Sequence, residues 1–102
     1  IAHITGGGLI GNLPRIIPKN LSIELNQKNL PNNNLFSWFK KISKLNDQEM
    51  LSTFNCGIGM AFIISKKELK KTQKFFEKIK EEIFIIGKTV KNMRNGENCK
   101  IT

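Results

Sequence analysis

Residues 1–15 read IAHITGGGLIGNLPR, and this first motif decides how the chain begins to fold. The apolar residues around His3 are typical of the end of a buried strand that emerges from a core. The three glycines that follow predict a turn, because glycine adopts positive φ angles and lets a ligand approach the backbone closely. A helix is expected over roughly residues 8–14. The motif therefore predicts a strand, a glycine turn and a helix start.

A glycine turn between a strand and a helix start is suited to holding an anion. The first N–H groups of a helix lack partners within it, and the helix dipole is positive at that end. Thr5 can add a hydroxyl donor or act as the N-cap, and His3 can donate to an anion or move a proton near neutral pH. Structural alternatives stay open: a tight turn without a ligand, a packing histidine, and a surface carboxylate as the partner of Arg15.

A second motif, FNCGIGM, occupies residues 54–60. We expect it to form the turn between a short helix and a strand. Asn55 offers both a donor and an acceptor there, while Gly57 and Gly59 keep the backbone open. The alternative is a tight turn that places the side chains of Phe54 and Met60 in the core.

Together the two motifs resemble the C-terminal part of the AIR synthetase family, the phosphoribosylformylglycinamidine cyclo-ligases of purine biosynthesis. The family carries AHITGGG, then an N-[IL]-P-R helix end and later F-N-x-G-[IV]-G-M, which residues 2–8, 12–15 and 54–60 match in order. The resemblance continues through residues 85–87 and, more weakly, to the end, so it covers nearly the whole chain. Departures fall in an Asn-rich loop and a Lys-rich helix, which we expect to face solvent.

The resemblance implies an ATP-dependent ring closure. AIR synthetases use ATP to activate the formyl amide oxygen of formylglycinamidine ribonucleotide as an iminophosphate, and a neighbouring nitrogen then closes the imidazole ring of aminoimidazole ribonucleotide. ADP and phosphate are released. In this scheme His3 is the catalytic residue, near the reacting amide. Eight residues are expected to bind substrate or phosphate: Thr5, Gly6, Gly7, Gly8, Asn12, Arg15, Asn55 and Gly57.

The resemblance also implies what lies outside the chain. The family's ATP-binding and Mg²⁺-binding residues belong to an amino-terminal domain, so this chain alone is expected to hold no metal and to be inactive. The parent protein is expected to be a homodimer that binds formylglycinamidine ribonucleotide and ATP. A sister member of the same ATP-dependent superfamily is the alternative enzyme, although His3 and the N-L-P-R run favour the cyclo-ligase.

The length of the chain limits its architecture. One hundred and two residues suffice for one domain with a modest core. The chain starts without Met inside an apparent strand, so we expect residues 1–102 to form a single partial domain, the latter part of an AIR synthetase C-terminal domain. The expected fold class is α+β, with a mixed β-sheet, helices packed mainly on one face, and an exposed sheet face or edge.

The net charge of +9 would ordinarily suggest a nucleic-acid or membrane partner. However, fifteen of the seventeen basic residues are Lys, and many follow one expected helix whose charged face is typical of solvent exposure. Tyr is absent, and the aromatic residues do not alternate with basic ones as they would on a stacking surface. We therefore expect neither partner. A basic α+β binding module is the alternative outside enzymes, and it predicts salt-dependent nucleic-acid affinity.

The cysteines and the apolar runs point to a cytoplasmic protein. Cys56 and Cys99 lie far apart in a sequence with a single His, which favours free thiols in a reducing cytosol over a zinc site or a disulfide. The longest apolar run, residues 60–64, is far too short to span a bilayer. We expect no membrane segment in this sequence.

The first half of the chain also predicts a strand and two helices after the first motif. Residues 21–25 alternate as a strand with one solvent-facing side. Residues 35–42 have the spacing of a short amphipathic helix. Asn46 and Glu49 have capping-box spacing, which predicts a further helix over residues 47–54.

Three more strands are expected in the second half, over residues 58–65, 83–90 and 99–102. The first is apolar through its middle, which predicts a central strand buried on both faces. A capping box at residues 65–68 opens a helix that runs to about Lys80, so the first two strands form a β–α–β unit. Asn95-Gly96 predicts a hairpin turn before the last strand.

Overall fold

The computed structural model describes residues 1–92 and 96–102. Its elements, in chain order, are β1 (Ala2–His3), α1 (Gly8–Asn12), η1 (Leu13–Ile16), β2 (Leu21–Leu25), η2 (Gln27–Asn29), α2 (Asn34–Ser43), α3 (Asp47–Thr53), β3 (Met60–Ala61), η3 (Lys66–Glu68), α4 (Leu69–Lys78), β4 (Gly87–Lys91) and β5 (Cys99–Ile101), where η marks a 3₁₀-helix. Both parallel and antiparallel strand pairs are present, so the predicted α+β class with a mixed sheet is confirmed.

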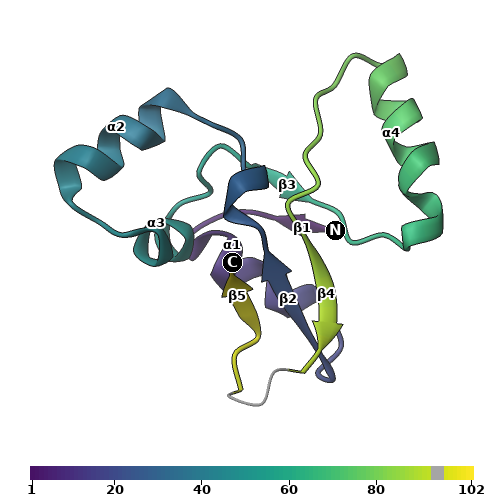
Figure 1. Cartoon of the computed structure of the whole chain (residues 1–102), viewed down its shortest axis with the longest axis horizontal. Helices are drawn as coiled ribbons and strands as arrows, with labels where there is room; N and C mark the ends of the chain where they lie inside the picture. Colours follow the sequence, from purple (N-terminus) through teal and green to yellow (C-terminus); the bar gives the residue numbers. More distant parts are fainter. Residues whose placement is uncertain (93–95) are drawn as a thin grey trace.

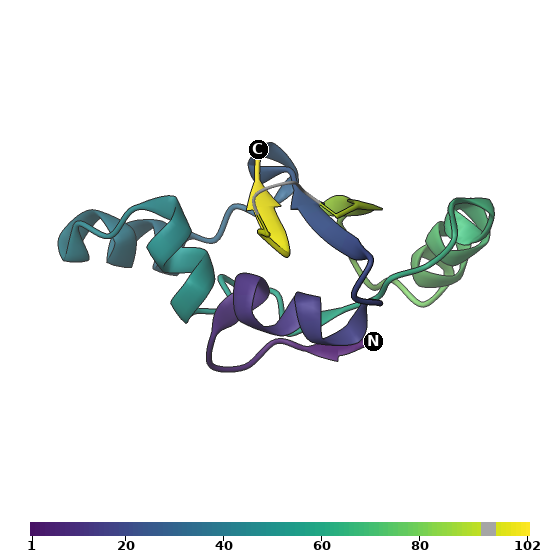
Figure 2. The same cartoon turned by 90° about the horizontal axis from the view of Figure 1, so that it is seen from below.

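The larger sheet has β2 at its centre. Its strand order is β4-β2-β5, with β2 antiparallel to β4 and parallel to β5. The register pairs Ile23 with Thr89 on one side and with Cys99 on the other. Figure 2 shows α1 on one face of this sheet, together with the smaller sheet formed by β1 and β3. The centre of the sheet is therefore β2, which the sequence predicted as a strand but not as the central one.

The predicted central strand over residues 58–65 is wrong. Only Met60 and Ala61 form strand β3, which pairs with β1. Phe62, Ile63 and Ile64 are between 40 and 46% exposed, so they are not buried on both faces. An apolar run becomes a strand only when a neighbouring strand takes its backbone N–H and C=O groups. Among the described strands, none pairs with residues 62–65.

The predicted β–α–β unit is also wrong, because β3 and β4 belong to different sheets. The strand expected from residue 83 begins only at Gly87. The expected capping box before α4 does not form: the side chain of Ser65 makes no cap hydrogen bond, and a 3₁₀ turn, η3, precedes the helix. In Figure 1, α4 extends away from the sheets, on the side opposite α2.

The last part of the chain differs from the predicted hairpin. The predicted turn includes Asn95, which lies outside the described residues. Strand β5 forms close to the predicted bounds, but it pairs with β2 and not with β4. The two strands therefore flank β2 on opposite sides instead of forming a hairpin with each other.

Both predicted helices in the middle of the chain are confirmed. Helix α2 begins after Asn33, whose side chain accepts from two backbone N–H groups of the first turn. Helix α3 begins with the predicted capping box: Glu49 N donates to Asn46 Oδ1 at 2.8 Å, and Asn46 N donates to Glu49 Oε2 at 2.8 Å. These reciprocal bonds satisfy two N–H groups that the helix itself leaves without acceptors.

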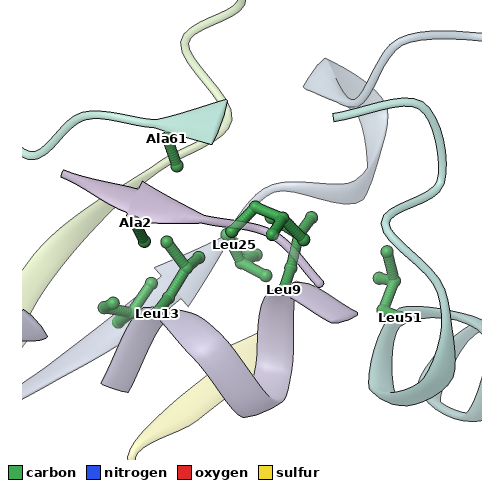
Figure 3. Packing of buried hydrophobic residues seen from close by; sticks show 8 residues of the cluster. Ala2, Leu9, Leu13, Leu25, Leu51 and Ala61 are labelled. Atoms are coloured by element: carbon green, nitrogen blue, oxygen red, sulfur yellow. The ribbon is translucent and has the colours of Figure 1, made fainter. Parts of the chain in front are cut away.

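The core lies between the two sheets and α3. It comprises eight buried residues, drawn as sticks in Figure 3: Ala2, Ile4, Leu9, Leu13, Ile23, Leu25, Leu51 and Ala61. Leu9 of α1 is completely buried within this cluster. This packing fixes both ends of the glycine turn, because Ile4 before the turn and Leu9 after it belong to the same cluster.

Candidate functional site

The first motif folds as the sequence predicts, into a strand, a turn and a helix. Strand β1 leads into the glycine turn (residues 5–8), and the N–H of Gly8 donates to Thr5 O at 3.0 Å to close it. Gly7 and Gly8 have φ angles of +96° and +60°. Since side chains disfavour this left-handed region, the turn needs glycine at both positions.

Gly8 also permits a close approach of the backbone to α3. A Cβ atom on Gly8 would lie 2.2 Å from Leu51 O and 2.6 Å from Phe54 O. Gly6 is different, because a Cβ atom there would meet no atom within 4 Å and its φ angle is not positive. The fold therefore explains Gly7 and Gly8, whereas Gly6 leaves open space beside the turn.

Asn12 holds the turn from within. Its side chain is 5% exposed, and Nδ2 donates to Gly8 O at 2.8 Å and to Thr5 O and Gly6 O at 3.3 Å each. Its Oδ1 accepts from Thr5 Oγ1 at 3.5 Å. Asn12 was predicted as an anion contact, but the structure directs its amide donors at the carbonyl groups of the turn.

Thr5 is not the N-cap of α1. The N-cap is Gly7, and no side chain caps the helix. The Thr5 hydroxyl instead points at Asn12 from an exposed position. The helix itself is a single short element of five residues, so the N–H groups of the turn matter more for an anion than the helix dipole does.

The second motif lies directly beside the first. His3 of β1 is paired with Met60 of β3, and Ile4 N donates to Gly59 O at 2.9 Å. The sequence alone does not reveal this pairing, and its available signal is two short apolar stretches that each adjoin glycines. The structure thus brings together two motifs that are far apart in the sequence.

The start of the second motif forms a tight turn. Gly57, with φ +91°, donates its N–H to Asn55 Oδ1 at 2.9 Å, so that oxygen is used within the turn. Phe54 packs edge-on against Phe39, with 5.2 Å between ring centroids. Met60 is 53% exposed, so the alternative that placed it in the core is wrong.

His3 and Arg15 both lie at the surface. The exposure of His3 argues against the alternative of a packing histidine. The ion pairs found among the described residues join Lys40 to Asp47 and Lys88 to Glu24, and neither involves Arg15. Both side chains are therefore accessible to a ligand.

Comparison with known proteins identifies the family. Residues 1–100 match the family model described as AIR synthase related protein, C-terminal domain. The chain belongs to this family. It is 40% identical over 102 residues to the phosphoribosylformylglycinamidine cyclo-ligase of Thermodesulfovibrio yellowstonii, covering 100% of this chain and 29% of that protein. It is 38% identical over 101 residues to the trifunctional purine biosynthetic protein adenosine-3 of Bos taurus, covering 99% of this chain and 10% of that protein.

A third relative is the phosphoribosylformylglycinamidine cyclo-ligase of Burkholderia multivorans. It is 42% identical over 97 residues, which cover 95% of this chain and 27% of that protein. This AIR synthase related C-terminal domain thus spans less than a third of the length of each of these three relatives.

Two hollows lie elsewhere on this AIR synthase related C-terminal domain. One of about 620 Å³ separates α1 from β5 and is lined by Ile10, Gly11 and Cys99, among others. Burial raises the pKa of the Cys99 thiol to about 11. The other, of about 310 Å³, lies between α2 and α3 beside Cys56. Neither hollow includes His3 or the glycine turn.

The surroundings of Cys56 disfavour its thiolate form. Burial raises the pKa of Cys56, and the nearby Asp47 carboxylate raises it further. A hydrogen bond from Lys40 lowers the pKa of Asp47.

In the described part of the chain, no three side chains of His, Cys, Asp or Glu gather into a group that could hold a metal ion. None of the helices described has the length and apolar character needed to cross a membrane.

Proposed function

We propose that this chain forms the C-terminal part of a phosphoribosylformylglycinamidine cyclo-ligase. The activity is the ATP-dependent closure of formylglycinamidine ribonucleotide to aminoimidazole ribonucleotide, with ADP and phosphate as the other products. The observation that carries the proposal is the pairing of the two motifs, with His3 opposite Met60 and Ile4 bonded to Gly59. The names of two of the relatives above, which are cyclo-ligases, support the reaction.

His3 is the proposed catalytic residue. It is exposed at the edge of the glycine turn, where an imidazole can donate a hydrogen bond to the reacting amide or move a proton during ring closure. The turn is the proposed site for a phosphoryl oxygen. The N–H groups of Gly6 and Gly7 have no acceptor among the described residues, so they are available to a ligand. The remaining proposed contacts are Thr5, Gly8, Arg15, Asn55 and Gly57, whereas Asn12 supports the turn from within.

ATP and Mg²⁺ are proposed to be held mainly by residues outside this chain. The described residues do not fit a Mg²⁺ site, because no three acidic, His or Cys side chains come together. The contribution proposed for this chain is therefore to bind and orient phosphoryl and amide oxygens with backbone N–H groups and His3. A homodimeric, cytoplasmic parent protein is part of the same proposal.

The test is ring closure by the complete protein that carries this sequence. With formylglycinamidine ribonucleotide and ATP, the wild type is expected to form aminoimidazole ribonucleotide. His3→Ala should lower turnover by about 10²–10⁴-fold, the usual contribution of a general acid or base. Lys70→Ala, on exposed α4, is the control and should leave turnover unchanged.

The outcomes separate the two parts of the proposal. Full turnover by His3→Ala would remove its catalytic role and keep the function. Absence of turnover by a well-folded wild type would remove the cyclo-ligase function, and assays for the sister activities of the ATP-dependent superfamily would follow. The family assignment of the chain does not depend on either result.

A further inference from the structure

The side chain of Asn12 is buried and directed into the glycine turn. Its buried amide bonds three carbonyl oxygens of the turn, those of Thr5, Gly6 and Gly8. We infer that Asn12 is a positioning residue, which holds these carbonyl groups inward and so directs the N–H groups of Gly6 and Gly7 toward a phosphoryl oxygen of the ligand. This inference rests on the proposed function.

The planar geometry of the peptide bond fixes where these N–H groups point. In a planar trans peptide the C=O of one residue and the N–H of the next point in opposite directions, and the described chain contains no cis peptide bond. The carbonyl of Thr5 faces Asn12, so the N–H of Gly6 points away from it. The carbonyl of Gly6 also faces Asn12, so the N–H of Gly7 points away as well. Two successive N–H groups therefore face the outer side of the turn.

Both N–H groups are free to bind. Neither has an acceptor among the described residues, whereas the next N–H, that of Gly8, is used by Thr5 O. Gly6 is exposed, and the space where its Cβ would stand is open. Successive N–H groups that point the same way form a concavity that binds anions. Asn12 thus acts on the ligand through the backbone and does not need to touch it.

The chemistry of the ligand is a phosphoryl oxygen, which both substrates of the proposed reaction carry. One is the phosphate of the nucleotide whose ring closes, and the other is the triphosphate of ATP. The two sources are distinguished by which Michaelis constant responds when the turn is disturbed. A turn that binds only one of them changes only that constant.

The experiment uses Asn12→Asp in the complete protein. The carboxylate keeps an acceptor for the Thr5 hydroxyl but loses both N–H donors, and it repels the carbonyl oxygens of the turn. The matched control is Asn29→Asp, the same change at an exposed amide that donates to Ile85 O at 2.9 Å, outside both motifs. A second variant, Asn12→Ser, is uncharged and shorter, and it serves if the first does not fold.

Two readouts separate positioning from a purely structural role. The first is KM for each substrate against kcat: loss of positioning raises one KM about tenfold, as the loss of a hydrogen bond or two to a ligand would. A purely structural defect lowers the folded fraction and hence the apparent kcat, and leaves KM unchanged. The second is the NMR chemical-shift change that inorganic phosphate causes in the Gly6 and Gly7 amide signals of protein labelled with ¹⁵N-glycine.

The expected result is a raised KM for one substrate and a loss of the phosphate-induced shifts in the Asn12 variants, with Asn29→Asp like the wild type. Wild-type KM values and wild-type shifts in a folded Asn12 variant would overturn the inference. If the wild type has no turnover, the proposed function fails and the phosphate titration decides alone. Shifts in the wild type that disappear in the Asn12 variant support positioning, and their absence in the wild type contradicts it.

Discussion

The two motifs with their supporting elements and the segment of residues 62–86 have similar apolar patterns but opposite surroundings. In the first region, Leu9, Leu25 and Leu51 come from three different elements and bury one another (Figure 3). In the second, called the limb (residues 62–86), most large apolar side chains stay exposed: Phe62, Ile63, Ile64, Phe75, Ile79, Phe84 and Ile85. An apolar pattern therefore predicts a helix or a strand, whereas the burial of its side chains depends on the elements that pack against it.

The largest effect is expected at the contact between the glycine turn and α3. Gly8→Ala should lower the free energy of unfolding by about 4 kcal/mol, because the left-handed backbone disfavours a side chain and the Cβ would collide with two carbonyl oxygens. Denaturant titration of the protein measures it. Gly11→Ala is the control, since that position is open and helical, and it should be neutral or slightly stabilising. Equal stability of the two variants would show that α1 does not need this close approach.

The next largest loss of stability is expected in the core of the same region. Leu9→Ala should cost about 3 kcal/mol, because Leu9 is fully buried and its truncation leaves a cavity in the centre of the cluster. Denaturant titration again provides the measurement. A cost below about 1 kcal/mol would mean that the cluster collapses around the lost side chain, and the two regions would then differ less than their burial suggests.

The capping box of α3 should contribute less. Asn46→Ala removes the acceptor of the Glu49 N–H, and the expected loss is about 1 kcal/mol. Asn46→Asp keeps an acceptor and should retain most of the stability. If the alanine variant is as stable as the wild type, the packing of Met50 and Leu51 alone holds α3 in place.

These local signals show how far the sequence could predict the fold and the site. The glycine turn and the Asn46 capping box depend on residues within a few positions of one another, and both formed as predicted. The strand predicted over residues 58–65 is wrong because a strand needs a pairing partner, and the apolar pattern does not contain the position of that partner. The capping box predicted at Ser65 does not form for another reason: its spacing permits the two hydrogen bonds but does not require them.

For the candidate site too, the local motifs were predictable from the sequence, whereas their contacts with distant residues were not. The sequence identified both motifs, but it could not show that β1 and β3 pair and so bring His3 opposite Met60. It also placed Asn12 among the anion contacts, since an exposed and a buried carboxamide look alike in a sequence. Only the three turn carbonyls around Nδ2 distinguish the two roles.

The ion pair between α2 and α3 should give a small, pH-dependent effect. A hydrogen bond from Lys40 lowers the pKa of Asp47, so the carboxylate stabilises the folded state above that pKa and the contribution is lost as the pH falls through it. Both side chains are partly exposed, and Asp47→Asn should cost only about 0.5 kcal/mol at about pH 7. Denaturant titration at about pH 3 should show a smaller difference between the variant and the wild type. A difference that stays constant with pH would assign the effect to helix α3 itself and not to the ion pair.

The smallest effect is expected in the limb, and it is the direct counterpart of Leu9→Ala. Phe75 is 57% exposed and contacts Phe76 with 5.4 Å between ring centroids, so Phe75→Ala removes little buried area. The free energy of unfolding should stay within about 0.5 kcal/mol of the wild type, as for most surface substitutions. Phe76→Ala is the sharper comparison, because Phe76 is half-buried and also contacts Phe62, with 5.9 Å between centroids. If Phe75→Ala instead costs as much as Leu9→Ala, the limb is packed in the folded protein as tightly as the core, and the contrast between the two regions does not hold.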